Sequence, residues 1–273
     1  MENLKLIDTH FHLWDLDVQN LPWLAGTDGS ITRTYRLSDL EGAYAALPGV
    51  DFLGGVYVEV DGDDPVQEDE LTYAICISDP KVLATMMRVH VSPTMRVPVF
   101  ATGIREPLHI DSQPQGRCLQ PEFLAGLAAM ADHGLPFEAC VRMEELADLA
   151  TACETVPGAT VVVNHMGNCV DLAGLESAGY RAAMERLAAC PNVYLKVSGY
   201  PTADRAFVDA IVSFARETFA ADRLMYASNW PVIDLYGSLP EHIAALHDAF
   251  GDDAGFWREN AMHCYNINPE VIG

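Results

Sequence analysis

The chain has 273 residues, half of them apolar, and a formal charge of −23 from 16 Lys and Arg against 39 Asp and Glu. This charge repels nucleic-acid phosphates and anionic membranes, so we expect neither as a partner, and no stretch approaches the roughly 20 apolar residues that span a bilayer. Since α/β barrels use about 250 residues for one domain, the length favours one domain over residues 1–273.

Strand-like and helix-like stretches alternate along the chain. Eight short runs have the nearly continuous apolar character of parallel strands buried on both faces; they cover residues 4–9, 52–60, 82–91, 99–105, 135–141, 159–164, 192–198 and 223–228. Helical patterns, apolar at every third or fourth residue, lie between them at 121–133, 142–154, 180–190 and 204–219. Eight alternating units predict an α/β fold of the TIM (β/α)8 barrel type.

One unit is irregular, and two loops are long. Only SPTMRVP, residues 92–98, separates the third and fourth strands, which is too short for a crossover helix and leaves the boundary between these strands open. Long polar loops follow the first strand, at residues 13–39, and the fourth, at residues 108–121. They leave the carboxyl ends of their strands, the face on which barrel enzymes carry their active sites.

Three histidines lie at predicted strand ends. DTHFH places His10 and His12 two residues apart, so that both imidazoles point the same way. VVVNHMGN brings His165 to the end of a later strand and to the same face of the barrel. Three imidazoles suit a divalent metal with an open coordination position, or they exchange protons without a metal. The alternative is that each histidine satisfies backbone groups of its own loop.

Other polar and aromatic residues end the remaining strands. The fork of donors on Arg105 matches a carboxylate or an oxyanion, although an ion pair with Glu59 or Glu106 is the alternative. For Lys196 and Glu138, the alternative to a functional role is a salt bridge inside the barrel. The aromatic residues that could line a pocket for a ring, or pack in the core, are Tyr57, Tyr200, Trp230, Trp14 and Trp23.

The seven cysteines are odd in number and scattered, without a C-x-x-C pair, as is usual for reduced thiols. The start, MENLKLIDTH, has no basic segment followed by an apolar run, the pattern of an export signal. We therefore expect a cytoplasmic protein with buried structural thiols. Whether the chain forms a homo-oligomer stays open.

Six segments run in order along nearly the whole chain: IDTHFHLWD, GVYVEVDGD, GIRE, VNHMG, YLKVSGY and RLMYASNWPV. Together they resemble the amidohydrolase-related family, and within it the branch of sugar lactonases and 2-pyrone-4,6-dicarboxylate lactonases. The resemblance implies a distorted TIM barrel that hydrolyses a cyclic ester, often without an essential metal. It also implies that His10 and His12 are the first-strand pair of the family, His165 its later-strand histidine and Arg105 the arginine that contacts the substrate.

Asn229 departs from the family pattern. The resemblance implies an aspartate at this position that activates water and, in metal-dependent relatives, also binds the metal. An amide takes up no proton at neutral pH, so we expect Asn229 to orient water or substrate while another group is the base. His165 is our first choice for this base, and the other available bases are His10, His12, Glu59 and Asp234.

The leading hypothesis is a hydrolase that opens a lactone of a small oxygenated acid, with water activated by a histidine and the oxyanion held by Arg105. Its catalytic residues are His10, His12, His165 and Asn229, and its substrate-binding residues are Arg105, Glu59, Tyr57, Lys196, Tyr200 and Trp230. Few cations lie near the strand ends, namely Arg105 with Lys196 or Arg88, so a neutral or singly charged small molecule is favoured as substrate.

Two alternatives stay open. No cofactor is required in the leading hypothesis; otherwise, one divalent metal, Zn or Mn, is held by His10, His12 and His165. With that metal, the protein would be a lyase, a decarboxylase or hydratase that acts on an aromatic or enolic acid. The second alternative is a barrel that binds a small ligand without catalysis.

Overall fold

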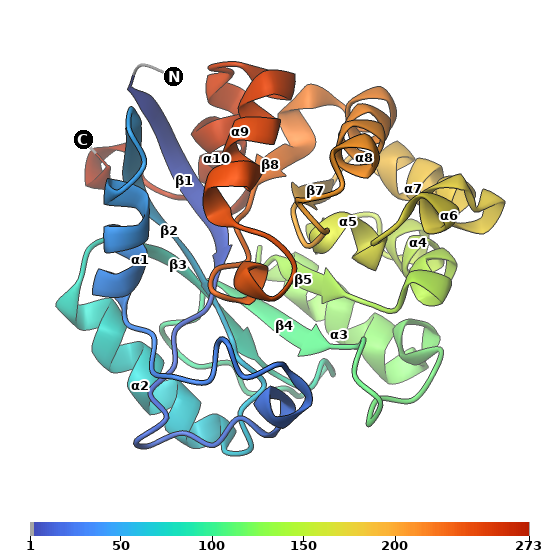
Figure 1. Ribbon diagram of the computed structural model, residues 1–273. Helices are drawn as coiled ribbons and strands as arrows, with labels where there is room; N and C mark the ends of the chain where they lie inside the picture. The colour runs from blue at the N-terminus through green and yellow to red at the C-terminus, as the bar shows by residue number, and fades with distance from the viewer. Residues whose placement is uncertain (1–2, 273) are drawn as a thin grey trace.

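Residues 3–272 are described by the computed structural model, and they form a barrel of eight parallel strands in sequential order (Figure 1). The strands are β1 (Leu4–Phe11), β2 (Val50–Val58), β3 (Val82–Arg88), β4 (Gly103–Pro107), β5 (Phe137–Cys140), β6 (Val161–Val163), β7 (Val193–Val197) and β8 (Leu224–Tyr226). The barrel closes just beyond β8, where Asn229 N donates to His10 O and His12 N donates to Trp230 O, both at 2.8 Å. The predicted TIM-type barrel is confirmed, while the predicted domain limits at residues 1–2 and 273 lie outside the described residues.

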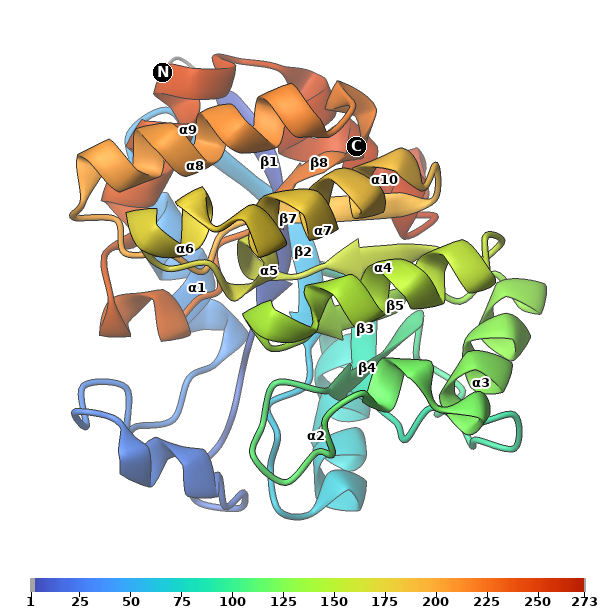
Figure 2. The same ribbon diagram turned by 90° about the vertical axis from the view of Figure 1, so that its right-hand side faces the viewer.

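Helices surround the strands (Figure 2). They are α1 (Leu37–Ala45), α2 (Pro65–Ser78), α3 (Pro121–Asp132), α4 (Leu146–Thr155), α5 (His165–Asn168), α6 (Leu172–Glu176), α7 (Ala178–Ala189), α8 (Arg205–Thr218), α9 (Leu239–Phe250) and α10 (Asn260–Cys264). In α8, the Asp204 side chain accepts from Phe207 N and caps the first turn, and one face, which includes Ile211 and Phe214, is buried. The four helices predicted from apolar spacing correspond to α3, α4, α7 and α8.

The link between β3 and β4 contains no helix, as its length predicted, but the fourth strand was placed too early. It spans Gly103–Pro107 and not residues 99–105. The apolar pair before it forms a turn in which Val99 is fully exposed, at 101%. Thr85 Oγ1 donates to Phe100 O at 2.9 Å and holds this turn against β3. The apolar composition of Val99 and Phe100 therefore predicts strand where the chain forms a turn, with Val99 in solvent and Phe100 half-buried.

Near the amino ends of the strands, the barrel interior is filled by apolar side chains and by residues that follow α10. Ile7, Val56 and Met225 pack in one buried cluster with Tyr265, which follows α10. Tyr265 OH donates to Glu138 at 2.6 Å. Glu138 and Lys196 are fully buried and form an ion pair of 2.7 Å. The salt bridge weighed from the sequence is therefore present inside the barrel.

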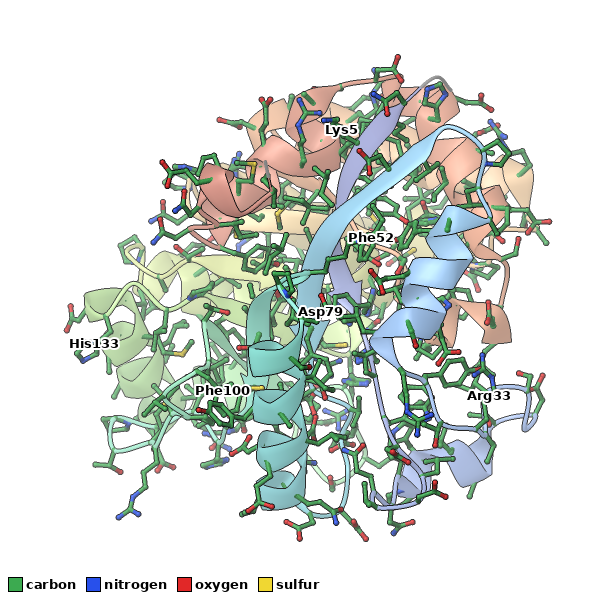
Figure 3. The ribbon with its side chains drawn as sticks, turned by 90° about the vertical axis from the view of Figure 1, so that its left-hand side faces the viewer. Lys5, Arg33, Phe52, Asp79, Phe100 and His133 are labelled. Carbon is green, nitrogen blue, oxygen red and sulfur yellow. The ribbon has the colours of Figure 1, made fainter. Side chains whose placement is uncertain are left out.

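The long loop after β1 packs against the barrel mouth. Trp14 N donates to Tyr35 O at 3.1 Å, and Tyr35 N donates back to Trp14 O at 2.9 Å. Arg33 lies at the outer edge of this loop, and Phe52 of β2 lies beside α1 (Figure 3). The cysteines whose side chains are described are free thiols, and the side chain of Cys76 lies outside this set. No described helix combines the length and the apolar character that crossing a membrane requires.

Candidate active site

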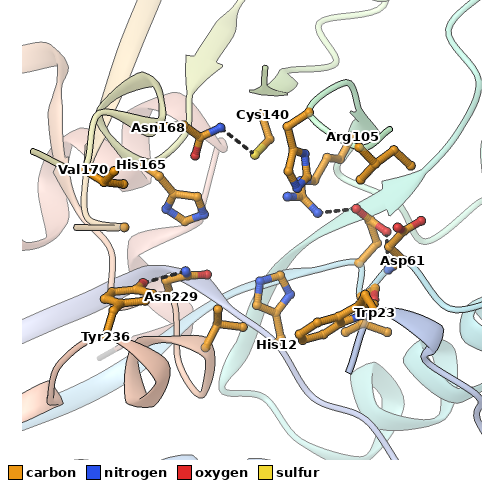
Figure 4. Close-up of a pocket in the computed structure, with 16 residues that line it drawn as sticks. His12, Trp23, Asp61, Arg105, Cys140, His165, Asn168, Val170, Asn229 and Tyr236 are labelled. Atoms are coloured by element: carbon orange, nitrogen blue, oxygen red, sulfur yellow. Dashed lines mark hydrogen bonds and ion pairs between the residues drawn. The ribbon is translucent and has the colours of Figure 1, made fainter. Parts of the chain in front are cut away.

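A cavity of about 370 Å³ opens at the carboxyl ends of the strands. Six side chains singled out from the sequence line it: His12, Trp23, Glu59, Arg105, His165 and Asn229. Arg105 lies on β4, Trp23 lies on the loop after β1, and the other four follow the ends of β1, β2, β6 and β8. Figure 4 shows His12, Arg105, His165 and Asn229 around one space. Residues far apart in the sequence meet here because the carboxyl ends of parallel strands converge at one end of a barrel.

The first-strand histidines form a hydrogen-bonded chain. His12 Nδ1 lies 2.9 Å from Val58 O, and since a carbonyl only accepts, this nitrogen carries the proton. Nε2 of His12 is then an acceptor, and it lies 3.1 Å from Nε2 of His10. Behind it, Nδ1 of His10 lies 3.3 Å from the Lys196 ammonium, which only donates. Protons therefore point from Lys196 to His10, and from His10 to His12.

His165 is held in place by an unusual turn after β6. His165, Met166 and Asn168 all have positive φ, at 54°, 52° and 60°, a conformation that non-glycine residues adopt at some cost and that clusters at functional sites. His165 Nδ1 lies 2.9 Å from Ser198 Oγ. A Cβ on Gly199 would lie 2.3 Å from Cβ of His165, so only glycine fits beside this imidazole.

Burial and neighbouring cations lower the pKa values of the three imidazoles. Burial, followed by the charge of Lys196, lowers the pKa of His10 well below its ordinary value. Burial, followed by the charge of Arg105, likewise lowers the pKa of His165 and brings that of His12 to about 3. All three rings are therefore neutral at neutral pH and can accept a proton, but they are weak bases.

Asn229 lies where the strand β8 meets the first-strand pair. Its backbone has a φ of 59°, and its Nδ2 donates to Tyr236 OH at 2.8 Å. Figure 4 shows Asn229 and Tyr236 on the same side of the cavity as His12. This hydrogen bond turns the amide nitrogen toward Tyr236 and leaves the amide oxygen as an acceptor for water or substrate.

The opposite side of the cavity carries an arginine paired with a carboxylate. Arg105 Nη1 contacts Glu59 Oε1, and Glu59 Oε2 accepts from Asp61 N at 2.8 Å. Burial alone would lower the pKa of Arg105, but the Glu59 carboxylate raises it above its ordinary value. Nε of Arg105 is buried and has no hydrogen-bond partner among the described residues. The guanidinium therefore keeps one donor that no described protein group uses, and the side chain lines the cavity.

Four of the predicted substrate-binding residues lie behind the cavity wall. Lys196 is engaged in the buried ion pair, and Tyr57 OH donates to a glutamate of α2 at 3.2 Å. The ring of Tyr200 packs against a histidine of α9 at 5.4 Å, and Trp230 packs against a tyrosine of the first loop at 5.0 Å. None of the four lines the cavity, and their contact with substrate stays a prediction.

The sequence did not single out several side chains that do line the cavity: Cys140, His109, Asn168 and Tyr236. Cys140 is the last residue of β5, so the strand-end criterion that selects the histidines also applies to it, whereas the scattered spacing of the cysteines predicts a buried structural thiol. Tyr236 follows a short 3-10 turn, and nothing in its neighbourhood in the sequence indicates the contact with Asn229.

The three imidazoles, as arranged, do not fit a metal ion. A metal-bound imidazole usually donates from its other nitrogen to a carboxylate or carbonyl, but the other nitrogen of His10 faces the Lys196 ammonium. The Nε2 atoms of His10 and His12 point at one another in a hydrogen bond, which uses the lone pair of His12. In the part of the chain that the structure describes, no three side chains of His, Cys, Asp or Glu form a metal-binding group.

Comparison with known proteins adds an independent line of evidence. An amidohydrolase 2 structure from Bifidobacterium longum subsp. infantis is 47% identical, covers 97% of this chain and 100% of its own, and superposes with a TM-score of 0.88. An L-fucono-1,5-lactonase of Burkholderia ambifaria is 28% identical over 96% of both chains. An amidohydrolase from Burkholderia multivorans with bound zinc shares the fold, with a TM-score of 0.83 at 21% identity over 96% of this chain and 99% of its own.

The family model described as amidohydrolase (Amidohydro_2) matches residues 7–262. This segment contains all eight strands except the first residues of β1, and every cavity residue discussed above. The chain therefore belongs to the amidohydrolase family of enzymes, as its resemblance implied.

Proposed function

We propose that this enzyme hydrolyses an uncharged lactone, the cyclic ester of a sugar acid. The observation that carries the proposal is the pairing, across one cavity, of a neutral His165 with the unpartnered Nε donor of Arg105. Hydrolysis of a ring ester needs a group that takes a proton from water and a donor for the oxygen that becomes negative. The curated relative from Burkholderia ambifaria, named L-fucono-1,5-lactonase, supports this class of substrate.

His165 is the base in this proposal. Its Nδ1 is occupied by Ser198 at 2.9 Å, which orients the ring and leaves Nε2 for water. Because its pKa is lowered by burial and by Arg105, it is always unprotonated at neutral pH, although it is a weak base. Arg105 holds the carbonyl oxygen as it becomes negative, and the developing negative charge offsets the repulsion that disfavours protonated His165.

The charge of the cavity favours a neutral substrate. Arg105 is the one Lys or Arg side chain among the residues that line the cavity, and Glu59 already pairs with it. Asp61 adds a further carboxylate, although Arg88 contacts it at 2.6 Å. A dicarboxylate such as a pyrone dicarboxylate would bring two negative charges to a wall with one compensated cation. We therefore propose a neutral aldonolactone.

No metal enters this proposal. The lyase alternative requires a divalent ion on His10, His12 and His165, whose mutual hydrogen bonds and contact with Lys196 leave too few free lone pairs. A binder without catalysis is disfavoured by the unpartnered Arg105 donor facing a histidine, an arrangement that binding a neutral ring does not need. The zinc-bound relative from Burkholderia multivorans is 21% identical, so the likeness carries over the fold and not the metal.

Proton release from purified protein tests the proposal, because opening a lactone yields an acid. Aldono-1,5-lactones and aldono-1,4-lactones are compared with 2-pyrone-4,6-dicarboxylate, each with and without a chelator. We expect turnover of a neutral lactone that survives the chelator, with kcat/KM more than about tenfold above that of the dicarboxylate, a difference of 1.4 kcal/mol.

His165→Gln identifies the base. We expect kcat to fall by about 10²- to 10⁴-fold, the usual contribution of a general base. The control is His133→Gln, which changes an exposed histidine at the end of α3 on the outer surface (Figure 3) and leaves kcat unchanged. A panel of lactones left untouched by the unmodified protein would refute the proposed function.

A further inference from the structure

Cys140 is the last residue of β5, and its side chain lines the cavity although it is 2% exposed. In Figure 4 its sulfur lies between Asn168 and Arg105. TIM-barrel enzymes carry their catalytic residues at the carboxyl ends of their strands. The remaining described cysteines line no part of the cavity, so Cys140 occupies a position that the other thiols do not share.

The surroundings of this thiol are donors and cations. Asn168 Nδ2 lies 3.7 Å from the sulfur, and Arg105 and His109 come from β4 and the loop after it. On the other side, β6 contributes only valines, and Glu138 on β5 itself is paired with a lysine. Burial by itself raises the pKa of Cys140, but His109 and then Arg105 lower it to about 6.

His109 shows the reciprocal effect. Cys140 raises the pKa of His109 above its ordinary value, against the effect of burial. Both side chains line the same cavity, and the two shifts favour a thiolate near an imidazolium, the arrangement by which cysteine is activated as a nucleophile. His109 is solvent-accessible at the mouth of the cavity, so it can return its proton to water or to a leaving group.

We propose that Cys140 is a covalent nucleophile of this enzyme, which opens the lactone as a thioester before water enters. This inference rests on the proposed lactonase function and names the group that attacks first. Three features of the cavity lead to it: the sulfur on the wall with Asn168 Nδ2 at 3.7 Å, His109 on the lining of the same cavity, and the unpartnered Nε of Arg105. Asn229 takes up no proton, so a nucleophile that is already deprotonated removes the need for a strong base.

The first step forms one bond and breaks another. The Cys140 thiolate attacks the carbonyl carbon of the lactone, and the carbonyl oxygen becomes an oxyanion held by Arg105. When the intermediate collapses, the ring C–O bond breaks, and the departing alkoxide takes the proton of His109. The products of this step are a thioester on Cys140, a free hydroxyl on the substrate and a neutral His109.

The second step restores the enzyme. Water gives a proton to His165, and its oxygen attacks the thioester carbonyl. The C–S bond breaks, Cys140 leaves as a thiolate, and the hydroxy acid is released. The proton on His165 passes to His109, which recovers its charge. The sum of both steps is lactone plus water giving the hydroxy acid, with no oxidant or reductant involved.

Alkylation by iodoacetamide tests the thiolate without any substrate. We expect Cys140 to react with a half-maximal rate near pH 6, in line with its lowered pKa, and a neutral lactone to protect it. The comparison within the same protein is Cys190, a half-buried thiol at the end of α7 whose pKa is raised by burial. Equal pH profiles for the two thiols would overturn the inference.

The thioester is tested by acid quench and mass spectrometry during turnover. We expect an adduct on Cys140 equal in mass to the whole lactone, because ring opening loses no atoms. Cys140→Ala and Cys140→Ser, with thermal unfolding measured to show that they fold, lose the adduct and at least about 10³-fold in kcat, or 4.1 kcal/mol. Cys190→Ser, whose hydroxyl can keep the contact of Sγ with Arg186 O, keeps both.

The outcomes separate the two proposals. Turnover by Cys140→Ala at the rate of the unmodified enzyme, without any adduct, overturns the nucleophile and leaves the lactonase intact. No turnover of any lactone by the unmodified enzyme overturns the proposed function and, with it, the acyl step. Turnover with a Cys140 adduct that forms as fast as product supports both.

Discussion

The Lys196→Met variant removes the cation of the ion pair inside the barrel. It tests whether Lys196 stabilises the fold or contacts the substrate. Lys196 Nζ lies 2.7 Å from Glu138 Oε2, and both side chains are 0% exposed. Tyr265 OH donates to Glu138 at 2.6 Å, and Asn164 Nδ2 donates to the same carboxylate. These donors remain in the variant, but the counter-charge is gone, and a buried carboxylate without one is costly.

The size of the effect follows from this geometry. Removing one partner of a buried pair costs about 3–5 kcal/mol. For a chain of this size each kcal/mol lowers the midpoint of thermal unfolding by about 2–4 °C, so we expect a loss of about 6–20 °C. In the double variant, Glu138→Gln removes the orphaned charge and keeps an oxygen that accepts from Tyr265. The double variant should therefore recover at least half of the loss.

Thermal unfolding by circular dichroism measures all three variants. The control is Arg205→Met, which removes an exposed arginine whose Nε lies at the same 2.7 Å from Asp209 Oδ1; exposed pairs contribute little to stability, so its midpoint should hardly move. The reasoning is refuted if Lys196→Met melts with the control, or if the double variant is less stable than the single one. Unchanged stability with a raised KM would instead show that Lys196 contacts the substrate.

Three further predictions concern the cavity itself. Asn229→Asp should change kcat by less than about tenfold, or 1.4 kcal/mol, because the proposed nucleophile and the proposed base are other residues; turnover confined to the aspartate variant contradicts this. Gly199→Ala should lower kcat by about 10²-fold by displacing His165, since its Cβ would lie 2.3 Å from Cβ of that residue. Gly134→Ala shares the positive φ, at 65°, without neighbours within 4 Å, and should lower stability alone. Finally, the pKa of His12 falls from 6.5 to about 3 on folding, so the unfolded state binds the extra proton between these pH values. The contribution of unprotonated His12 to the free energy of unfolding is complete above pH 6.5 and is lost toward pH 3 at about 1.4 kcal/mol per pH unit. Urea titrations at several pH values detect this slope, and His12→Gln flattens it.

The fold could be predicted from the sequence because each strand is a short apolar run between turn residues. β6, for example, is made only of valines and is fully buried, as a strand covered on both faces must be. The fourth strand shows the limit of this argument. Val99 and Phe100 have the composition of a strand, yet Val99 is fully exposed, and no local pattern distinguishes an exposed apolar turn from a buried strand.

The site could be predicted where strand ends carry it and not where side-chain direction decides. His12, His165 and Arg105 were found because parallel strands bring their carboxyl ends together. Lys196 lies on a strand too, but its side chain points to the buried Glu138 and not to the cavity. Cys140 also ends a strand, but the sequence does not predict its place in the cavity. Its neighbours come from other elements, and no sequence pattern shows that they surround it.

The amide at position 229 becomes understandable from how charge is divided across the cavity. Asn229 lies with His12 on one side, and Arg105 lies with Cys140 on the other (Figure 4). A carboxylate at 229 would raise the pKa of His12 and favour an imidazolium there, whereas the amide keeps that side neutral and rich in hydrogen bonds. The cations are then gathered beside the thiol. In the proposed reaction, negative charge is stabilised on the side of Arg105, while the neutral side binds the hydroxyl groups of the proposed sugar ring. An asparagine at this position is therefore compatible with hydrolysis, provided that the attack comes from the opposite wall.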